Sequence, residues 1–228
     1  NGSSFGPRRG TDAPAAEVTQ QLTINYWRRT LGNRSSGKQG YALARVAAAR
    51  GARVTLVAAN TALPDPAGTN LIQVGTAIEL REAVLNAAAD ADVVIMAAAV
   101  ADFRPAHYTE SKIKKEDGEE SLTLQLVRNP DILAEIAAYR PNPDQLVVGF
   151  AAETHNILAY GRAKLKHKRC DLLVVNEVGE HKAFGSEENE AIILSTDGSE
   201  TPVPYGSKEA LADQVWDLII ARLPCLDA

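Results

Sequence analysis

The stretch QLVVGFAAETHNILAYGRAKLKHKRCDLLVVN (145–176) decides the fold class that we expect for this chain. Its two ends, 145–153 and 171–176, are short apolar runs of the kind found in strands buried on both faces of a parallel sheet. Between them, 154–170 has the length and the basic character of a surface helix. Parallel strands need such a crossover, so the stretch predicts a strand–helix–strand unit.

The same alternation continues in both directions along the chain. Strands are expected at 52–60, 71–74, the start of 91–103, 122–127 and 190–196, and helices at 40–51, 76–90, 129–139 and 207–223. We therefore expect an α/β fold, a Rossmann-like mostly parallel sheet with helices on both faces. The run 190–196 is expected to be edge-like.

Bulk properties bound the function. A chain of 228 residues and 24.4 kDa suits one domain, which we expect over 22–228, and the polar, Pro/Gly-rich start 1–21 is expected to be a flexible tail or linker. A net charge of -5 argues against nucleic-acid partners, and no apolar run has the length of a membrane span. Cys170 and Cys225 show no metal-binding spacing, which suggests reduced thiols and a cytoplasmic protein.

Ligands of such sheets bind beyond the carboxyl ends of the strands. Three expected strand ends are rich in small or polar residues: MAAAVADF (96–103), GFAAET (149–154) and VVNEVG (174–179). Any one of them can be a tight strand-to-helix turn. Three in register beside a basic helix favour a binding site.

The loop GNRSSGKQ (32–39) comes within one residue of a phosphate-binding P-loop, in which Gln39 would have to be Ser or Thr. The preceding segment 22–31 alternates at best, whereas a P-loop follows a buried apolar strand. Small and hydroxyl residues before a helix nevertheless favour an anion. The alternative is that Ser35 or Ser36 merely caps the helix.

Lysines gather in two places, 112–115 and 164–168. A row of lysines is usually a solvated face, but convergent lysines are also what a triphosphate needs. Lys164 and Lys168 are four apart and share a helix face. A dinucleotide-binding domain is a third alternative, although no GxGxxG follows the first strand.

Seven blocks, in this order, resemble phosphopantothenoylcysteine synthetase from about residue 32 to 223. They are GNRSSGKQG (32–40), AAAVADFRP (97–105), SKIKK (111–115), NPDIL (129–133), VGFAAET (148–154), AKLKHKRCDLLVVNEVG (163–179) and GSKEALA (206–212). The resemblance implies a ligase of coenzyme A synthesis that activates 4′-phosphopantothenate with CTP and Mg²⁺ and then joins it to L-cysteine. It also implies a homodimer and, in many bacteria, fusion to a decarboxylase half.

The resemblance assigns roles residue by residue. Asn33 matches the asparagine beside the acyl-nucleotide, and Lys112 matches the flap lysine of the first half-reaction. The residues matching the nucleotide pocket are Asp102, Lys112, Asn129, Pro130, Asp131, Ile132, Phe150, Lys164 and Lys168. Those matching the substrate site are Asn33, Ser35, Ser36, Ala98 and Ala99. Mg²⁺ is expected to be carried mostly by the triphosphate, with Asp102 as the candidate protein ligand.

One segment departs from the family pattern. The family enters this region through an apolar strand and a glycine-rich AGGTxEPID-like turn, whereas residues 18–31 read VTQQLTINYWRRTL. A second hypothesis is therefore a catalytically weakened homologue that binds nucleotide or a phosphopantetheine-like ligand.

Overall fold

The structure is a computed structural model that describes residues 23–25, 30–32, 35–107, 123–153, 155–177 and 188–224. The tail expected at 1–21, Asn33, Lys112 and Cys225 lie outside the described residues. Within the described part, no helix combines the length and the apolar character that a membrane crossing requires.

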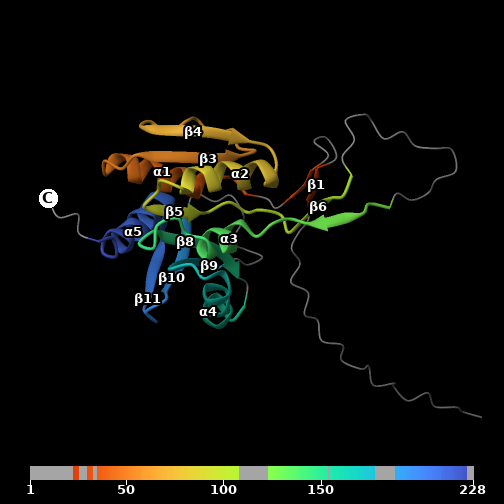
Figure 1. The fold of residues 1–228 in the computed structure, drawn as a ribbon. Coiled ribbons are helices and arrows are strands. Elements are labelled where there is room, and N and C mark those ends of the chain that lie inside the picture. The colour runs from red at the N-terminus through yellow and green to blue at the C-terminus, as the bar shows by residue number, and fades with distance from the viewer. Residues whose placement is uncertain are drawn as a thin grey trace, which may run out of the picture.

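A five-stranded sheet forms the centre of the molecule, in the order β11-β10-β9-β8-β5 (Figure 1). Its strands are β5 (Val93–Met96), β8 (Leu146–Glu153), β9 (Leu172–Glu177), β10 (Glu188–Ser195) and β11 (Glu200–Ser207). β8 pairs in parallel with both β5 and β9, as the opening stretch predicts, and β10 and β11 add an antiparallel edge. The expected α/β fold is confirmed.

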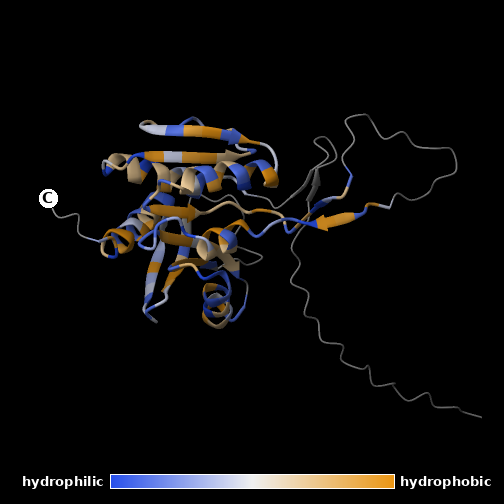
Figure 2. Ribbon diagram, in the orientation of Figure 1, coloured by the Kyte–Doolittle hydropathy of each residue, from blue (hydrophilic) through white to orange (hydrophobic). Residues whose placement is uncertain are grey.

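The helices cover both faces of this sheet (Figure 1). α1 (Lys38–Ala49) and α5 (Lys208–Ile220) share one apolar cluster with the sheet, while α2 (Ala77–Ala88), α3 (Ile132–Ala138) and α4 (Ile157–Lys168) share another. Consecutive residues of one strand enter opposite clusters: Val147 faces α2–α4 and Val148 faces α1 and α5. This alternation explains why the central strands are apolar without interruption (Figure 2).

Local sequence signals set the helix starts. Thr76 and Glu79 form a reciprocal capping box at the start of α2, and the Ser207 side chain caps α5. At α3 the cap is Asp131, whose side chain accepts from the amide of Ala134, so Pro130 precedes the helix.

The remaining strands form three two-stranded ladders. β3 (Val54–Ala59) and β4 (Thr69–Val74) pair in parallel, and among the described residues no ladder joins them to β5. β1 (Thr23–Asn25) with β2 (Thr30–Gly32), and β6 (Phe103–Pro105) with β7 (Leu126–Arg128), are antiparallel pairs. β3 and β4 contact α1 and α2 instead of extending the central sheet directly.

The prediction that 190–196 is edge-like is wrong. β10 lies between β9 and β11, so β11 is the edge strand on this side of the sheet, and β5 is at the other edge. The sequence hides β11 because it contains Pro202 and Pro204, which lack the N–H that a ladder needs. Successive N–H groups of a strand point to opposite edges, so residues two apart point to the same edge. Pro202 and Pro204 can therefore both face the free edge, where prolines are tolerated.

Gly161 is where α4 approaches the sheet closely. A Cβ at this position would lie 2.7 Å from Leu194 Cδ1 and 2.9 Å from Val175 Cγ2. We expect Gly161→Val to lower the free energy of unfolding by about 2–3 kcal/mol, because overpacking forces neighbouring side chains or the helix to move. The matched control is Ala163→Val, at an exposed position of the same helix, where only the small helix-propensity cost of about 0.6 kcal/mol applies. Equal losses in urea unfolding would contradict the close packing.

Candidate functional site

The carboxyl ends of the parallel strands β5, β8 and β9 meet at one edge of the sheet. The first turn of α1 lies at the same edge, since a Cβ on Gly40 would be 3.9 Å from the Cβ of Ala97, directly after β5. The polar and small segments that the sequence pointed to are therefore brought together. This edge, which is formed by the carboxyl ends of the strands and is distinct from the sides where the edge strands lie, is the candidate site.

The loop before α1 depends on Gly37. Its φ of +73° lies in the left-handed region, which disfavours residues other than glycine. In addition, a Cβ at this position would lie only 2.6 Å from Thr61 Cγ2, so a side chain would clash. Gly37 is also the N-cap, so the alternative that Ser35 or Ser36 is the cap is wrong. Their hydroxyls instead accept, at 3.4 Å, from the amides of Gly37 and Lys38, and both serines are exposed.

The P-loop alternative is not supported. The described strand that enters this loop is β2, which has three residues and pairs antiparallel with β1. A P-loop instead follows a buried strand of a parallel sheet.

The segment after β5 offers backbone to a ligand. Ala98, Ala99 and Asp102 are exposed, and the two alanines present nothing larger than a methyl group. Asn129 holds the end of this segment: its Nδ2 donates to the carbonyl of Ala101 at 2.8 Å, and its backbone N–H donates to that of Asp102 at 2.7 Å.

Of the residues that follow Asn129, Asp131 lies at the candidate site and Ile132 lies in the core. Asp131 caps α3 and forms an ion pair with Lys168. Ile132 is only 3% exposed and belongs to the cluster under α2–α4, so its side chain packs in the core. Ile132 can contribute only its backbone to a nucleotide pocket.

Both lysines expected to hold phosphates already contact carboxylates. Lys164 Nζ lies 2.5 Å from Glu153 Oε1, at the end of β8, and Lys168 pairs with Asp131. The alternative of a purely solvated lysine face does not account for these contacts. The two ion pairs place the ammonium groups of Lys164 and Lys168 beside the end of β8 and the start of α3.

Phe150 lies on the other face of the sheet, against the cluster of α1 and α5. Beyond Gly149 the described residues of β8 have a ladder on the β9 side only, because the pairing with β5 ends at Met96. A nucleotide that touches both Phe150 and Lys164 would therefore pass across this open edge of β8 or around its carboxyl end.

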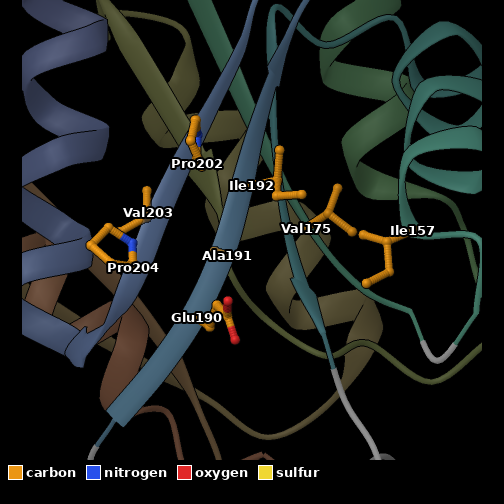
Figure 3. Close-up of a pocket in the computed structure, with 8 residues that line it drawn as sticks. All are labelled: Ile157, Val175, Glu190, Ala191, Ile192, Pro202, Val203 and Pro204. Carbon is orange, nitrogen blue, oxygen red and sulfur yellow. The ribbon is translucent and has the colours of Figure 1, made fainter.

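Two hollows differ in character. One, of about 400 Å³, lies between the start of α4 and strands β9–β11 (Figure 3), and β8 separates these strands from β5 in the sheet. Its lining is Ile157, Val175, Glu190, Ala191, Ile192, Pro202, Val203 and Pro204, mostly apolar with one carboxylate, which does not suit a polyanion. The other, of about 230 Å³, lies beside the first turns of α1 and α5 and includes Lys38, Arg45 and Lys208.

Thiol and protein-held metal chemistry have little support here. Cys170 is fully buried, and burial raises the pKa of its thiol to about 11, so it is not a nucleophile at neutral pH. No three His, Cys, Asp or Glu side chains within the described ranges are placed to hold a metal ion. A Mg²⁺ brought by a triphosphate would find Asp102 as an exposed carboxylate at this edge.

Comparison with known proteins identifies the family. The family described as the DNA/pantothenate metabolism flavoprotein C-terminal domain matches residues 27–223. The chain belongs to this family. The resemblance to phosphopantothenoylcysteine synthetase is thereby confirmed.

Individual members of the family agree. The chain is 52% identical over 209 residues to the coenzyme A biosynthesis bifunctional protein CoaBC of Mycolicibacterium smegmatis, covering 87% of this chain and 50% of that protein. It thus spans about half the length of the relative. The crystal structure of a C-terminal domain of CoaBC superposes with a TM-score of 0.68 at 34% identity, covering 82% of this chain and 83% of that one. A Cab2 mutant in complex with phosphopantothenate-cysteine shares the fold alone, with a TM-score of 0.60 at 17% identity over 83% of this chain and 79% of that one.

Within this family domain, sequence reasoning missed several residues that the structure places at the site. The Oδ1 atom of Asn176, near the end of β9, is buried and has no hydrogen-bond partner among the described residues, which marks it as an acceptor available to a ligand. Arg104, which no pattern singled out, contacts Asn129. Asn176 was within reach of sequence reasoning, because a polar residue directly follows the apolar run 172–175.

The Asp131–Lys168 pair leads to a prediction about pH. Burial raises the pKa of Asp131. The hydrogen bonds from the Lys168 ammonium and the Ala134 amide lower it by more than burial raises it, so the pKa lies below its ordinary value. A depressed pKa stabilises the fold above the ordinary value of about 3.9, and this stabilisation is lost as pH falls through the folded pKa. We expect Lys168→Met to raise the Asp131 pKa in a carboxyl NMR titration, whereas Lys166→Met, on the same helix, leaves it nearly unchanged. An unchanged pKa in Lys168→Met would show that the ion pair does not form in solution.

Proposed function

We propose that the chain is a ligase of coenzyme A biosynthesis that joins 4′-phosphopantothenate to L-cysteine through an acyl-cytidylate, consuming CTP and releasing CMP and pyrophosphate. The observation that carries this proposal is the convergence of four of the family's sequence blocks, in their described parts, on one edge of the sheet. The loop before α1, the segment after β5, the start of α3 and the end of β8 all contribute to that edge.

In the first half-reaction, the carboxylate of 4′-phosphopantothenate attacks the α-phosphorus of CTP. A carboxylate oxygen–phosphorus bond forms, the bond to the bridging oxygen breaks, and pyrophosphate leaves with the electron pair. Lys112 would balance the charge that builds on the α-phosphate. Mg²⁺, when bound, would neutralise part of the charge of the triphosphate. Asp102 is the candidate protein ligand for it.

In the second half-reaction, the amine of cysteine attacks the acyl carbon. The new carbon–nitrogen bond displaces CMP, which leaves with the electron pair of the acyl–oxygen bond, and the amine proton goes to solvent. The Asn33 carboxamide would donate to the oxyanion formed on the way. Catalysis of this kind needs positioning and charge stabilisation, which agrees with the buried, unreactive thiol of Cys170.

The described residues of the site would form two groups, one that binds the nucleotide and one that binds 4′-phosphopantothenate. Phe150 would pack near the base, while Asn129–Asp131, Lys164 and Lys168 would support the nucleotide across the open edge of β8. Ser35 and Ser36, in front of α1, and the exposed Ala98 and Ala99 would line the substrate. Polyanion binding at this edge is favoured by the start of α1.

Further features of the whole protein follow from the relatives. Because the matched relative is called bifunctional and this chain covers 50% of it, we propose that a decarboxylase half is fused to the ligase in the full-length protein. A cytoplasmic homodimer and a preference for CTP over ATP are part of the same proposal.

The test is a two-stage assay. Pyrophosphate release is measured with CTP and 4′-phosphopantothenate, and amide product is measured after cysteine is added. ATP, GTP and UTP compete in the first stage to establish nucleotide preference. Folded protein that performs neither stage would defeat the proposal.

One observation favours a second candidate, a weakened homologue that binds nucleotide without turnover. Residues 18–31 lack the family's glycine-rich turn, and β1 and β2 in this region form a short antiparallel pair. Calorimetry that detects CTP binding in a protein with no pyrophosphate release would support this candidate. Turnover would exclude it.

A further inference from the structure

Arg104 of β6 contacts the candidate site through Asn129. One guanidinium nitrogen, Nη1, donates to the main-chain carbonyl of Arg128 at 2.9 Å and to Oδ1 of Asn129 at 3.1 Å. A guanidinium can only donate, so the Asn129 atom that faces it must be the carbonyl oxygen. Arg104 therefore sets which way the Asn129 carboxamide points.

That orientation decides what the other end of the carboxamide can do. With its oxygen on Arg104, the amide presents Nδ2 to the carbonyl of Ala101 at 2.8 Å, while its backbone N–H reaches Asp102. A flipped carboxamide would set two oxygens against each other at Ala101. One residue thus holds two consecutive carbonyls, the first of them through a carboxamide that Arg104 orients.

The segment held in this way lies between Val100, which packs against the apolar cluster of α2–α4, and Phe103, which begins the β6–β7 ladder. Ala98, Ala99 and Asp102 are exposed, and alanine side chains bury little surface. On its other side, Asn129 leads within two residues to Asp131, which caps α3 and pairs with Lys168. Asn129 consequently joins the segment after β5 to the start of α3.

We propose that Arg104 is a positioning residue of the ligase: it acts through Asn129 to hold the Ala101–Asp102 backbone in the geometry that the nucleotide site uses. This inference rests on the proposed function. It also gives Asn129 a second role, because its carboxamide holds the Ala101 carbonyl in addition to any contact with the nucleotide. Arg104 touches no reacting atom, so its loss should appear in nucleotide affinity more than in turnover.

The test compares Arg104→Ala, Asn129→Ala and the double variant. We expect Arg104→Ala to raise the KM for CTP about tenfold with kcat within about threefold of wild type, since one charge-assisted hydrogen bond is lost. Because Arg104 acts through Asn129, the double variant should be no worse than Asn129→Ala alone. Arg128→Ala removes the same charge from the neighbouring strand without touching the carboxamide, and should stay within about twofold. An unchanged KM in Arg104→Ala, or a double variant whose loss is the product of the single losses, would overturn the inference.

Amide hydrogen exchange provides a readout that needs no ligand. The Asn129 N–H, bonded to Asp102, should be protected in wild type and in Arg128→Ala and should exchange at least about tenfold faster in Arg104→Ala. Rapid exchange in wild type would overturn the inference even if Arg104→Ala did not fold. If wild type shows no ligase turnover but its Asn129 protection depends on Arg104, the proposed function fails while the Arg104–Asn129 linkage stands. If wild type turns over normally and Arg104→Ala matches it in both KM and exchange, the proposed function stands while the linkage fails.

Discussion

Replacing Lys112 with glutamine is expected to reduce pyrophosphate release by about 10²–10³-fold, the loss typical of removing one preorganised donor from a developing anion. The α-phosphate gains negative charge as the carboxylate attacks, and an ammonium group compensates this charge better than a neutral amide does. Substrate binding should change much less, because the charge in question develops only in the transition state.

The measurement is single-turnover pyrophosphate release with CTP and 4′-phosphopantothenate. Lys114→Gln, two positions away in the same basic block, is the matched control because it makes the same change of charge. A first step at the wild-type rate in Lys112→Gln would remove Lys112 from the mechanism. An equal loss in both variants would reduce its role to general attraction of the triphosphate.

Asn33→Asp is expected to slow the second half-reaction and largely spare the first, which is the reverse of the effect expected for Lys112→Gln. A carboxylate at this position cannot donate to the oxyanion that forms when cysteine attacks, so consumption of the acyl-cytidylate should slow by about 10²-fold. Formation of the acyl-cytidylate should be affected far less, and the intermediate should therefore accumulate.

Rapid quenching followed by chromatography, with and without cysteine, measures both steps directly. Asn70→Asp introduces the same charge at an exposed position of β4 and should leave both steps unchanged. Equal losses of formation and consumption in Asn33→Asp would contradict the assigned role, since the residue would then serve both transition states alike.

Much of the candidate site could be located from the sequence, because its position follows from local rules. The apolar runs at 93–96, 146–150 and 172–175 are parallel strands, and their small or polar continuations do meet at one edge of the sheet. Gly37, Asp131 and Lys168 lie at the starts or ends of elements that the pattern predicts.

The partners of these residues could not be predicted. Lys168 pairs with Asp131, and Arg104 orients Asn129, across 37 and 25 positions of the chain. Such contacts depend on how α3, α4, β6 and β7 pack, whereas a sequence pattern reports on neighbours within a few residues. For the same reason Ile132, which belongs to a binding-site block in sequence, has its side chain in the core.

The sequence by itself determined the alternation of most strands and helices along the chain, the two apolar faces of the central parallel strands and the end of the sheet where ligands are expected. These properties depend on the spacing of apolar residues and on turn chemistry, both of which act locally. Only the tertiary structure decided that β11 is the edge strand, that Phe150 and Lys164 lie on opposite faces, and that the β3–β4 pair stands apart from β5. Strand order and side-chain pairing result from the packing of the whole chain, in which distant segments compete for the same buried surface.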